Sequence, residues 1–263
     1  PLIDLDSAPS KYTADKTQHK YLVSEAMEVC KFLNGKIVIS RCVDVDFTTT
    51  GWNPQLLNLR SKFPAAFVYL LHCEAFGTWL GATPETLVKK SGEKFKTHAV
   101  AGTKWDNDPF TQKEFEEQNL VVEAILKDLE LESKSADPRR ELSYGSIRHL
   151  ETKIKWESSE DLENVAYKLH PTPAVNGWPK KEATEFILQE EGYDRELYTG
   201  FIALNIPKIT QTAFVNLRCM QLFRDRIRFY VGGGINALSD PDSEWEESEK
   251  KMNSLLDVIQ IDE

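Results

Sequence analysis

The stretch Leu169–Pro179, LHPTPAVNGWP, places three prolines and a glycine between two segments of helical character. Each proline fixes its own φ and pushes the preceding residue toward an extended conformation, so the stretch predicts a rigid connector rather than a flexible loop. Pro179 suits the first position of the helix that follows. Taken by itself the stretch is typical of a structural turn, and the rest of the chain decides whether it has a further role.

The composition is that of a globular protein with a sizeable core, since 41% of the 263 residues are hydrophobic. A formal net charge of -10 disfavours a nucleic-acid or anionic-membrane partner, because either would be repelled over most of the surface. An anionic ligand would need cations gathered locally. The chain has no run of about eighteen apolar residues and no basic N-terminus followed by an apolar segment, which predicts a cytoplasmic protein.

The cysteines and histidines show no metal-site or disulfide pattern. Cys30, Cys42, Cys73 and Cys219 lack CxxC spacing, and the five histidines form neither HxxxH nor HExxH. The sequence therefore predicts reduced core thiols and no histidine metal site.

Hydrophobic periodicity and turn residues predict helices that alternate irregularly with groups of strands. Helices are expected over residues 21–33, 111–131, 160–169, 180–190 and 241–259, and strands over 36–45, 67–73, 77–81, 93–102, 200–206, 213–223 and 226–235. Thr111 and Glu114 form a capping-box pattern that marks one helix start, and Phe110 and Phe115 occupy hydrophobic-staple positions. This order predicts an α+β fold with largely antiparallel sheets.

The chain reads as one domain over residues 1–263, because it contains no convincing linker or repeat. Residues 1–20 lack periodicity and are expected to form an irregular lead-in. Since the first residue is Pro1 rather than Met, an upstream segment is expected to be missing.

Charged residues near the C-terminus could carry chemistry. In the last predicted helix, Glu244, Glu247 and Lys251 share one face at spacings i, i+3 and i+7. Such a stripe is usually a solvated, salt-bridged face. The strand just upstream ends in Gly232-Gly233-Gly234, where the absence of side chains lets a ligand approach the backbone.

Three further charged residues stand at element boundaries or on a helix. Glu85 follows a strand at a Thr-Pro turn, Lys36 begins a strand, and Glu117 lies in an acid-rich helical turn. Each is more often a solvated or capping residue than a site residue when it is considered alone.

Considered together and in order, ten segments resemble the chorismate-utilising enzymes, with isochorismate synthase of the menaquinone or siderophore type as the closest pattern. These segments are GKIVISR, LGATPE, AVAGT, KEFEEQNLVV, IRHLET, LHPTPAVNG, DRELYTG, LRC, VGGGI and SDPDSEWEESEKK. The pair LHPTPAVNGWP and DRELYTG is the most specific. The resemblance implies an α+β sandwich of two largely antiparallel sheets packed face to face, with helices outside.

The resemblance also implies the ligands of a Mg²⁺ ion and of the substrate, chorismate. Glu117 and Glu247, with Glu244 as a further candidate, would hold the Mg²⁺, and a shifted alignment would replace Glu117 by Glu114 or Glu116. Tyr198 and Arg218 would bind the enolpyruvyl carboxylate, for which a guanidinium gives paired donors. Close backbone contacts would come from Gly102, Thr103, Gly232 and Gly234.

By the same resemblance, Lys36 is the general base that activates water for attack at ring C2, and Glu85 is the general acid that protonates the departing 4-hydroxyl. These roles require a neutral lysine and a protonated glutamic acid, and a glutamic acid stays protonated when it is buried or near negative charge. Lys251 would orient the substrate. His149 would lie near the ring, and the proline-braced loop would present Ala174 and Val175 to it.

Several alternatives within and beyond the family remain open. Lys36 favours water over ammonia, because the ammonia-using anthranilate synthases tend to have glutamine there, and Ala101 replaces the nucleophilic lysine of some aminodeoxychorismate synthases. The chain is thus expected to act without an amidotransferase subunit and as a monomer. Salicylate synthase shares the first reaction step, and a non-catalytic chorismate-binding protein is the alternative from another class.

Overall fold

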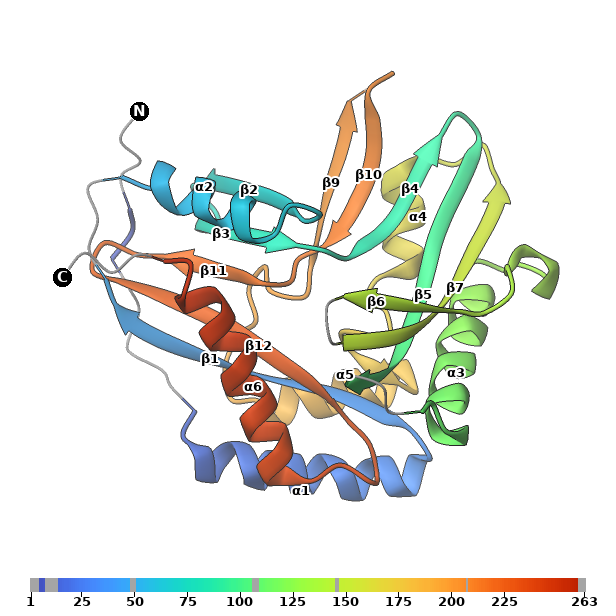
Figure 1. The fold of residues 1–263 in the computed structure, drawn as a ribbon, viewed down its shortest axis with the longest axis horizontal. Coiled ribbons are helices and arrows are strands. Elements are labelled where there is room, and N and C mark those ends of the chain that lie inside the picture. The colour runs from blue at the N-terminus through green and yellow to red at the C-terminus, as the bar shows by residue number, and fades with distance from the viewer. Residues whose placement is uncertain are drawn as a thin grey trace. The chain divides into compact units, whose positions relative to one another are not determined.

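The computed structural model describes residues 5–7, 14–47, 51–105, 109–144, 147–206 and 208–259. The chain forms two compact units, whose elements are labelled in Figure 1. The first unit comprises Pro1–Glu85, Val175–Gly200 and Asn216–Glu263, and the second comprises Thr86–Ala174 and Phe201–Val215. Each unit is built around its own six-stranded antiparallel sheet.

The sheet of the first unit has the strand order β2-β3-β11-β12-β1-β8. Its strands are β1 (Lys36–Asp46), β2 (Phe67–Cys73), β3 (Gly77–Thr83), β8 (Gly177–Trp178), β11 (Cys219–Leu222) and β12 (Arg226–Ile235). β1 and β12 pair from Ile37 opposite Ile235 to Asp46 opposite Arg226. The β-branched and aromatic residues of both strands favour this long ladder because they pack well on a pleated surface.

The helices of the first unit are α1 (Lys16–Leu33), α2 (Asn53–Lys62), α5 (Lys180–Glu190) and α6 (Pro241–Leu256). α1 and α6 lie side by side and contact β12 (Figure 1). Val23, Ala26 and Cys30 of α1 are fully buried against Ile37 and Ile39 of β1. Burial of a side chain such as Val23 or Ile37 contributes about 1.5–3 kcal/mol, which favours packing of the start of β1 against this helix.

The sheet of the second unit has the order β6-β7-β5-β4-β10-β9. Its strands are β4 (Thr86–Ser91), β5 (Lys94–Trp105), β6 (Arg140–Tyr144), β7 (Ile147–Glu157), β9 (Phe201–Ile206) and β10 (Thr210–Val215). The helix α3 (Gln112–Asp128) packs on β5 and β7, and α4 (Leu162–Leu169) packs on β4, β9 and β10 (Figure 1). A single 3-10 turn, η1, covers Ser133–Ser135.

The predicted α+β fold with two largely antiparallel sheets and flanking helices is confirmed, as are most of the predicted elements. The predicted start of α3 is also confirmed: the Glu114 carboxylate accepts hydrogen bonds from the backbone N–H and the hydroxyl of Thr111, at 2.8 and 2.7 Å. The rings of Phe110 and Phe115 lie 6.4 Å apart, as a hydrophobic staple requires. The chain was predicted to be a single domain. The structure divides it into two compact units, and the single domain remains a prediction.

Some predicted boundaries were wrong. The lead-in is shorter than residues 1–20, because Asp15 and Gln18 form a capping box that starts α1 at Lys16. Pro179 is the N-cap of α5 rather than its first helical residue, since its ψ of 145° is extended.

The predicted strand over residues 213–223 is in fact two strands, β10 and β11, which belong to different sheets. Arg218, between them, has a φ of 49°, a left-handed conformation that interrupts an extended chain. α2, β4, β6, β7 and the two-residue strand β8 were not predicted, because their apolar residues do not follow a clear helical or alternating period. Among the described residues, none of the helices is long and apolar enough to span a bilayer.

Candidate active site

The predicted site residues are distributed over both units. The first unit contains Lys36, Glu85, Val175, Tyr198, Arg218, Gly232, Gly234, Glu244, Glu247 and Lys251, and the second contains Gly102, Thr103, Glu117, His149 and Ala174. Within the first unit, the structure gathers most of these residues around the first residue of β1, one end of β12 and the exposed side of α6.

Lys36 is half-buried at the start of β1, and its side chain passes over Gly234 of β12. A Cβ at position 234 would overlap the Lys36 Cε and would lie 2.9 Å from the Lys36 Nζ. Gly234 is therefore needed for the lysine to adopt this position. Gly177 makes a similar close approach on the other side of β1, because its Cβ would overlap the backbone carbonyl of Lys36.

Glu85 lies between β3 and β4, directly after the Thr-Pro turn. Burial raises the pKa of its carboxyl group above the ordinary value, against the opposing effects of Lys36 and Arg218. The carboxyl group is thus within electrostatic range of both cations, and burial still shifts its titration toward the protonated form. A general acid requires a shift in this direction.

Tyr198 and Gly232 are also in contact. Tyr198 is buried, and a Cβ at position 232 would lie 2.9 Å from its hydroxyl oxygen and 2.7 Å from the carbonyl oxygen of Ile39. Burial raises the pKa of Tyr198, so its hydroxyl remains a hydrogen-bond donor at all ordinary pH values. Glu85 contributes to the same shift, which indicates that the two side chains are neighbours.

Arg218 combines an exposed side chain with a constrained backbone. Its guanidinium carbon lies 5.3 Å from the centre of the Phe63 ring, and its carbonyl oxygen accepts a hydrogen bond from the backbone N–H of Ala82. A left-handed φ at a residue other than glycine costs energy and recurs at functional sites. Arg218 directly precedes β11, and its positive charge opposes the rise in the pKa of Glu85.

The acidic face of α6 lies beside the glycines of β12. Lys251 Nζ is 2.7 Å from Glu247 Oε1 and donates a hydrogen bond of 2.8 Å to the carbonyl oxygen of Gly232. Glu244 Oε1 accepts a hydrogen bond of 2.8 Å from the Ser239 hydroxyl, and a Cβ at Gly233 would lie 3.2 Å from Glu244 Oε2. The predicted alignment of Glu244, Glu247 and Lys251 on one face is confirmed.

The loop that contains Val175 is anchored by a buried ion pair between Glu191 and Arg195, whose side chains are 1% and 13% exposed. The Arg195 guanidinium donates to the carbonyl oxygens of Val175 and Val38, at 3.0 and 2.7 Å. Glu191 Oε1 accepts from the backbone N–H and the hydroxyl of Ser40, at 2.6 and 3.0 Å. The proline-rich loop and β1 are thereby fixed to each other within the first unit.

In the second unit, β5 has an irregularity between Ala101 and Thr103, where Gly102 adopts a φ of +69°. A Cβ on Gly102 would lie 2.9 Å from the Cβ of Glu114, so the turn can approach α3 only because residue 102 is glycine. The side chain of Thr103 lies outside the described residues. Its backbone pairs with that of His149 on β7.

The three candidate carboxylates of α3 differ in their surroundings. Glu114 caps the helix and its Oε1 lies 3.2 Å from Lys104 Nζ. Burial raises the pKa of Glu114, but the Thr111 hydrogen bonds and Lys104 outweigh this effect and leave the pKa below its ordinary value. Glu116 is exposed and accepts a hydrogen bond from Gln112. Half-buried Glu117 thus remains the predicted metal ligand of this helix.

The chain was compared with families of known proteins. The family described as "Chorismate binding enzyme" matches residues 5–260, nearly the whole chain. The chain belongs to the chorismate-binding enzyme family. The resemblance inferred from the sequence motifs is therefore confirmed.

Among its relatives is Isochorismate synthase EntC from Escherichia coli strain K12, which is 29% identical over 242 residues that represent 85% of this chain and 62% of EntC. Isochorismate synthase MenF from the same strain is 28% identical over an aligned region of 287 residues. The match covers 100% of this chain and 64% of MenF. The chain thus spans less than two thirds of the length of these relatives.

Solved structures of the family have the same fold. The menaquinone-specific isochorismate synthase MenF from Escherichia coli superposes with a TM-score of 0.81 at 25% identity, over 99% of this chain and 65% of MenF. Anthranilate synthase component I from Streptococcus pneumoniae TIGR4 superposes with a TM-score of 0.79 at 22% identity, over 96% of this chain and 60% of that one, and indicates the fold alone.

The donor chemistry of this chorismate-binding enzyme suits a hard divalent cation. Within the described residues no group of three or more His, Cys, Asp or Glu side chains converges on one point. Mg²⁺ needs fewer protein ligands, because it usually keeps several waters and takes only one or two carboxylates together with substrate oxygens. Glu247 and Glu244, one turn apart on α6, can supply such carboxylates.

Glu191 and Arg195 are not among the residues predicted from the sequence. The signal that could have found them is DRELYTG, which places Arg195 three residues before Tyr198. An arginine so close to a predicted substrate ligand would be expected to contact the substrate. The structure instead assigns it to the backbone carbonyls of Val175 and Val38.

Proposed function

We propose that this chorismate-binding enzyme is an isochorismate synthase, which converts chorismate to isochorismate with Mg²⁺. The observation that carries the proposal is the arrangement around Glu85: a carboxyl group whose pKa is raised by burial, within electrostatic range of Lys36 and Arg218. The names of the relatives EntC and MenF support the same reaction.

The proposed reaction uses Lys36 and Glu85 as a base and an acid. The neutral amine of Lys36 accepts a proton from water while the water oxygen bonds to ring C2. Both ring double bonds shift, from C1=C2 and C5=C6 to C1=C6 and C4=C5, as the bond between C4 and its hydroxyl oxygen breaks. Glu85 gives its proton to the departing oxygen, which leaves as water. Return of one proton from Lys36 to Glu85 through solvent restores both groups.

The other predicted residues would hold the substrate. Arg218 and Tyr198 would bind the enolpyruvyl carboxylate, and Lys251, already held by Glu247 and the Gly232 carbonyl oxygen, would orient the ring. His149, the backbone of Gly102, Thr103 and Gly234, and the loop residues Ala174 and Val175 would complete the contacts. A rigid loop favours catalysis because it keeps the reacting carbon near its nucleophile.

Mg²⁺, when bound, would supply positive charge opposite the ring carboxylate of chorismate. We propose Glu117 and Glu247 as its ligands, with Glu244 as a further carboxylate on the same face of α6. An acidic protein needs such a cation, since its formal net charge of -10 repels a dianion. We also propose that the chain acts as a monomer and without an amidotransferase subunit, because Lys36 suits water as the nucleophile.

The test is incubation with chorismate and Mg²⁺ in ¹⁸O-labelled water without ammonia, followed by chromatography and mass spectrometry. Isochorismate that carries ¹⁸O at C2 is expected, and a Glu85→Gln variant should form it about 10² to 10⁴-fold more slowly. Salicylate and pyruvate would show that the chain is a salicylate synthase. Unchanged chorismate, with binding still detectable by titration calorimetry, would show a non-catalytic binding protein and contradict the proposal.

A further inference from the structure

One face of the second sheet gathers lysines from three neighbouring strands. Lys89 of β4 lies directly opposite Lys96 of β5, which in turn lies directly opposite Lys155 of β7. The next pair along β5 and β7 with the same orientation is His98 opposite Lys153. The lysine face is defined here as Lys89, Lys94, Lys96, Lys153 and Lys155.

Such a row is unfavourable unless an anion compensates it, because like charges in opposed positions of a sheet repel one another. Lys155 pairs with Asp137, whereas in the described part of the chain Lys89, Lys94 and Lys96 form no ion pair or hydrogen bond through their ammonium groups. Burial, followed by Lys153 and Lys155, lowers the pKa of Lys96.

The carboxylates on the same face do not cancel this charge. Glu151 is buried and is shared between His98 and Arg140, both of which donate to it. Glu157 lies opposite Lys94 at the end of the ladder. The cations of the face therefore outnumber its carboxylates, in a chain whose formal net charge is -10.

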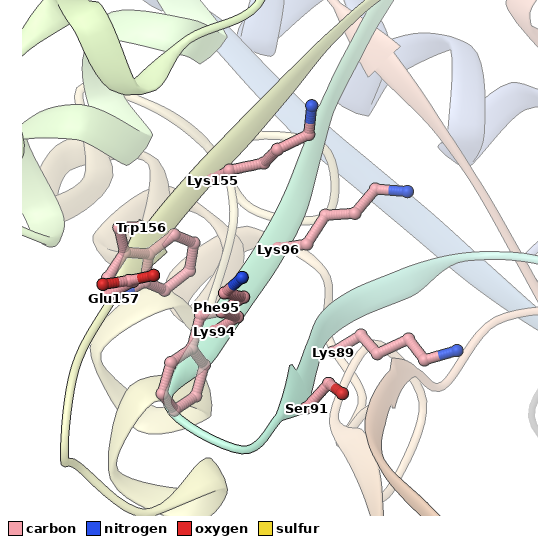
Figure 2. Close-up of a pocket in the computed structure, with 8 residues that line it drawn as sticks. All are labelled: Lys89, Ser91, Lys94, Phe95, Lys96, Lys155, Trp156 and Glu157. Atoms are coloured by element: carbon pink, nitrogen blue, oxygen red, sulfur yellow. The ribbon is translucent and has the colours of Figure 1, made fainter.

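The lysine face is the side of the sheet that the helices of the second unit leave uncovered. On the other side, Gln118 of α3 donates to Thr152 of β7, and the rings of Phe95 and Trp156 stack 5.3 Å apart. Figure 2 shows the side chains of Lys89, Lys96 and Lys155 extending to one side of the strands. These lysines line an open hollow of about 510 Å³, which also borders Phe95 and Trp156 at the edge of the face.

The lysine face continues along β7 to a predicted site residue. The extra residue in the β5–β7 ladder, Gly102, belongs to β5, and β7 itself is continuous from Ile147 to Glu157, so His149 has the same orientation as Lys153 and Lys155. At about 3.3 Å per residue, His149 is roughly 13 Å from Lys153 and 20 Å from Lys155 along the strand. The positive charge thus extends along the sheet away from His149.

We propose that the lysine face captures the dianionic substrate electrostatically and leads it along β7 to His149. The inference rests on the proposed function, which makes chorismate the substrate. The acidic chain as a whole repels a dianion, so productive encounters depend on a region of opposite potential. Clefts lined by one sign of charge raise the association rates of oppositely charged ligands by about 10 to 1,000-fold, and salt removes the effect.

The experiment compares wild type with the triple variant Lys89→Gln, Lys96→Gln, Lys155→Gln across a range of ionic strengths. At low salt, kcat/KM should fall about ten-fold while kcat stays within two-fold, and the difference should vanish in about 0.5 M salt. A matched control replaces the exposed Lys31, Lys134 and Lys181 by glutamine and changes the net charge equally. Replacement of the three face lysines by arginine should preserve kcat/KM.

Equal loss of kcat/KM in the control would contradict the proposal, because net charge alone would then explain it. An unchanged kcat/KM in the glutamine variant would contradict it as well, with thermal melts showing that each variant is folded. If wild type forms no isochorismate, the proposed function is wrong, and capture is then judged from chorismate binding by calorimetry at low salt. A Kd equal in wild type and the glutamine variant would overturn the inference.

Discussion

The two units use charge in different ways. In the first unit the chemically important charges are buried or held by several partners, as for Glu191, which bonds with Arg195 and Ser40. In the second unit the cations lie on an uncovered sheet face, and most have no partner among the described residues. Function in the first unit therefore depends on desolvation and position, whereas in the second it depends on a field that salt can screen.

The largest effect is expected from Glu85→Gln, which removes the proton donor and preserves the size of the side chain. Because a positioned general acid contributes roughly 10² to 10⁴-fold, kcat should fall by about that factor. KM should change little. Steady-state kinetics with chorismate measure both, and exposed Glu93→Gln is the control. A kcat within three-fold of wild type would show that desolvation of Glu85 has no catalytic purpose.

The next largest effect is expected from Arg195→Ala. Removal of one partner of a buried ion pair leaves the other charge uncompensated and costs about 3–5 kcal/mol. Chemical denaturation should show this loss of unfolding free energy. The matched control is Lys181→Ala, in which a lysine of α5 loses its exposed pair with Glu185, also four residues away in the chain, and a smaller loss is expected there. Equal losses of unfolding free energy in the two variants would show that burial of the Glu191–Arg195 pair does not increase the cost of breaking it.

The glycines of β12 allow a sharper test, because Gly232 and Gly234, two residues apart on the strand, meet different neighbours. A Cβ at Gly234 meets the end of the Lys36 side chain, which can move aside, whereas a Cβ at Gly232 meets the rigid carbonyl of Ile39 at 2.7 Å. Gly234→Ala should therefore lower kcat about 10 to 100-fold with little change in stability, since displacement of a catalytic group by about 1 Å has that effect.

Gly232→Ala should instead lower the melting temperature by several degrees, because the backbone of β1 must shift. Melts by circular dichroism and kinetics on the same preparations compare the two variants. A destabilised Gly234→Ala with normal kcat per folded molecule would contradict the placement of Lys36.

Stability as a function of pH tests the desolvation of Glu85. Its pKa is raised in the folded protein, so the folded state binds more protons than the unfolded state as pH rises above the ordinary value of 4.5. Stability is then lost through this group as pH increases. Glu85→Gln removes the loss, so the variant should gain stability relative to wild type between pH 4 and pH 8, measured by urea denaturation. If the difference in unfolding free energy between the variant and wild type does not change with pH, the raised pKa of Glu85 is contradicted.

Much of the fold follows from the sequence, and the reasons are local. The β-branched residues of KIVISRCVDV, the Asn34-Gly35 stop and the Thr111–Glu114 pattern each predict an element from local sequence, and the structure has all three. The break at Arg218 was not predictable from the local sequence, because it depends on the pairing of β10 and β11 with strands of two different sheets. α2 was missed for a related reason: its helical stripe is weak and tertiary packing of Leu59 fixes it.

The candidate site was predicted only because many motifs occur in order, since each residue alone is typical of a solvated surface. Sequence could name Lys36 and Gly234 but not their contact, which depends on the β1–β12 pairing. It also could not show that Glu191 and Arg195 hold the Val175 loop, because their partners are backbone atoms distant in the chain. A side chain that binds backbone atoms can have any type of residue as its partner, so the sequence gives no sign of the contact.

The smallest effect is expected at Glu114, where the second unit does hold a carboxylate in place. Its pKa is lowered in the folded protein, so it contributes stability above the unfolded value of 4.5 that is lost as pH falls through the folded value. Glu114→Gln should therefore cost about 0.5–2 kcal/mol at pH 7, the usual range for a lost helix cap, and less at pH 3. Urea denaturation at both pH values measures this, with exposed Glu116→Gln as the control. If Glu114→Gln is instead neutral for stability but weakens the Mg²⁺ dependence of turnover, Glu114 is the metal ligand of α3, and the cap and the metal site are the same carboxylate.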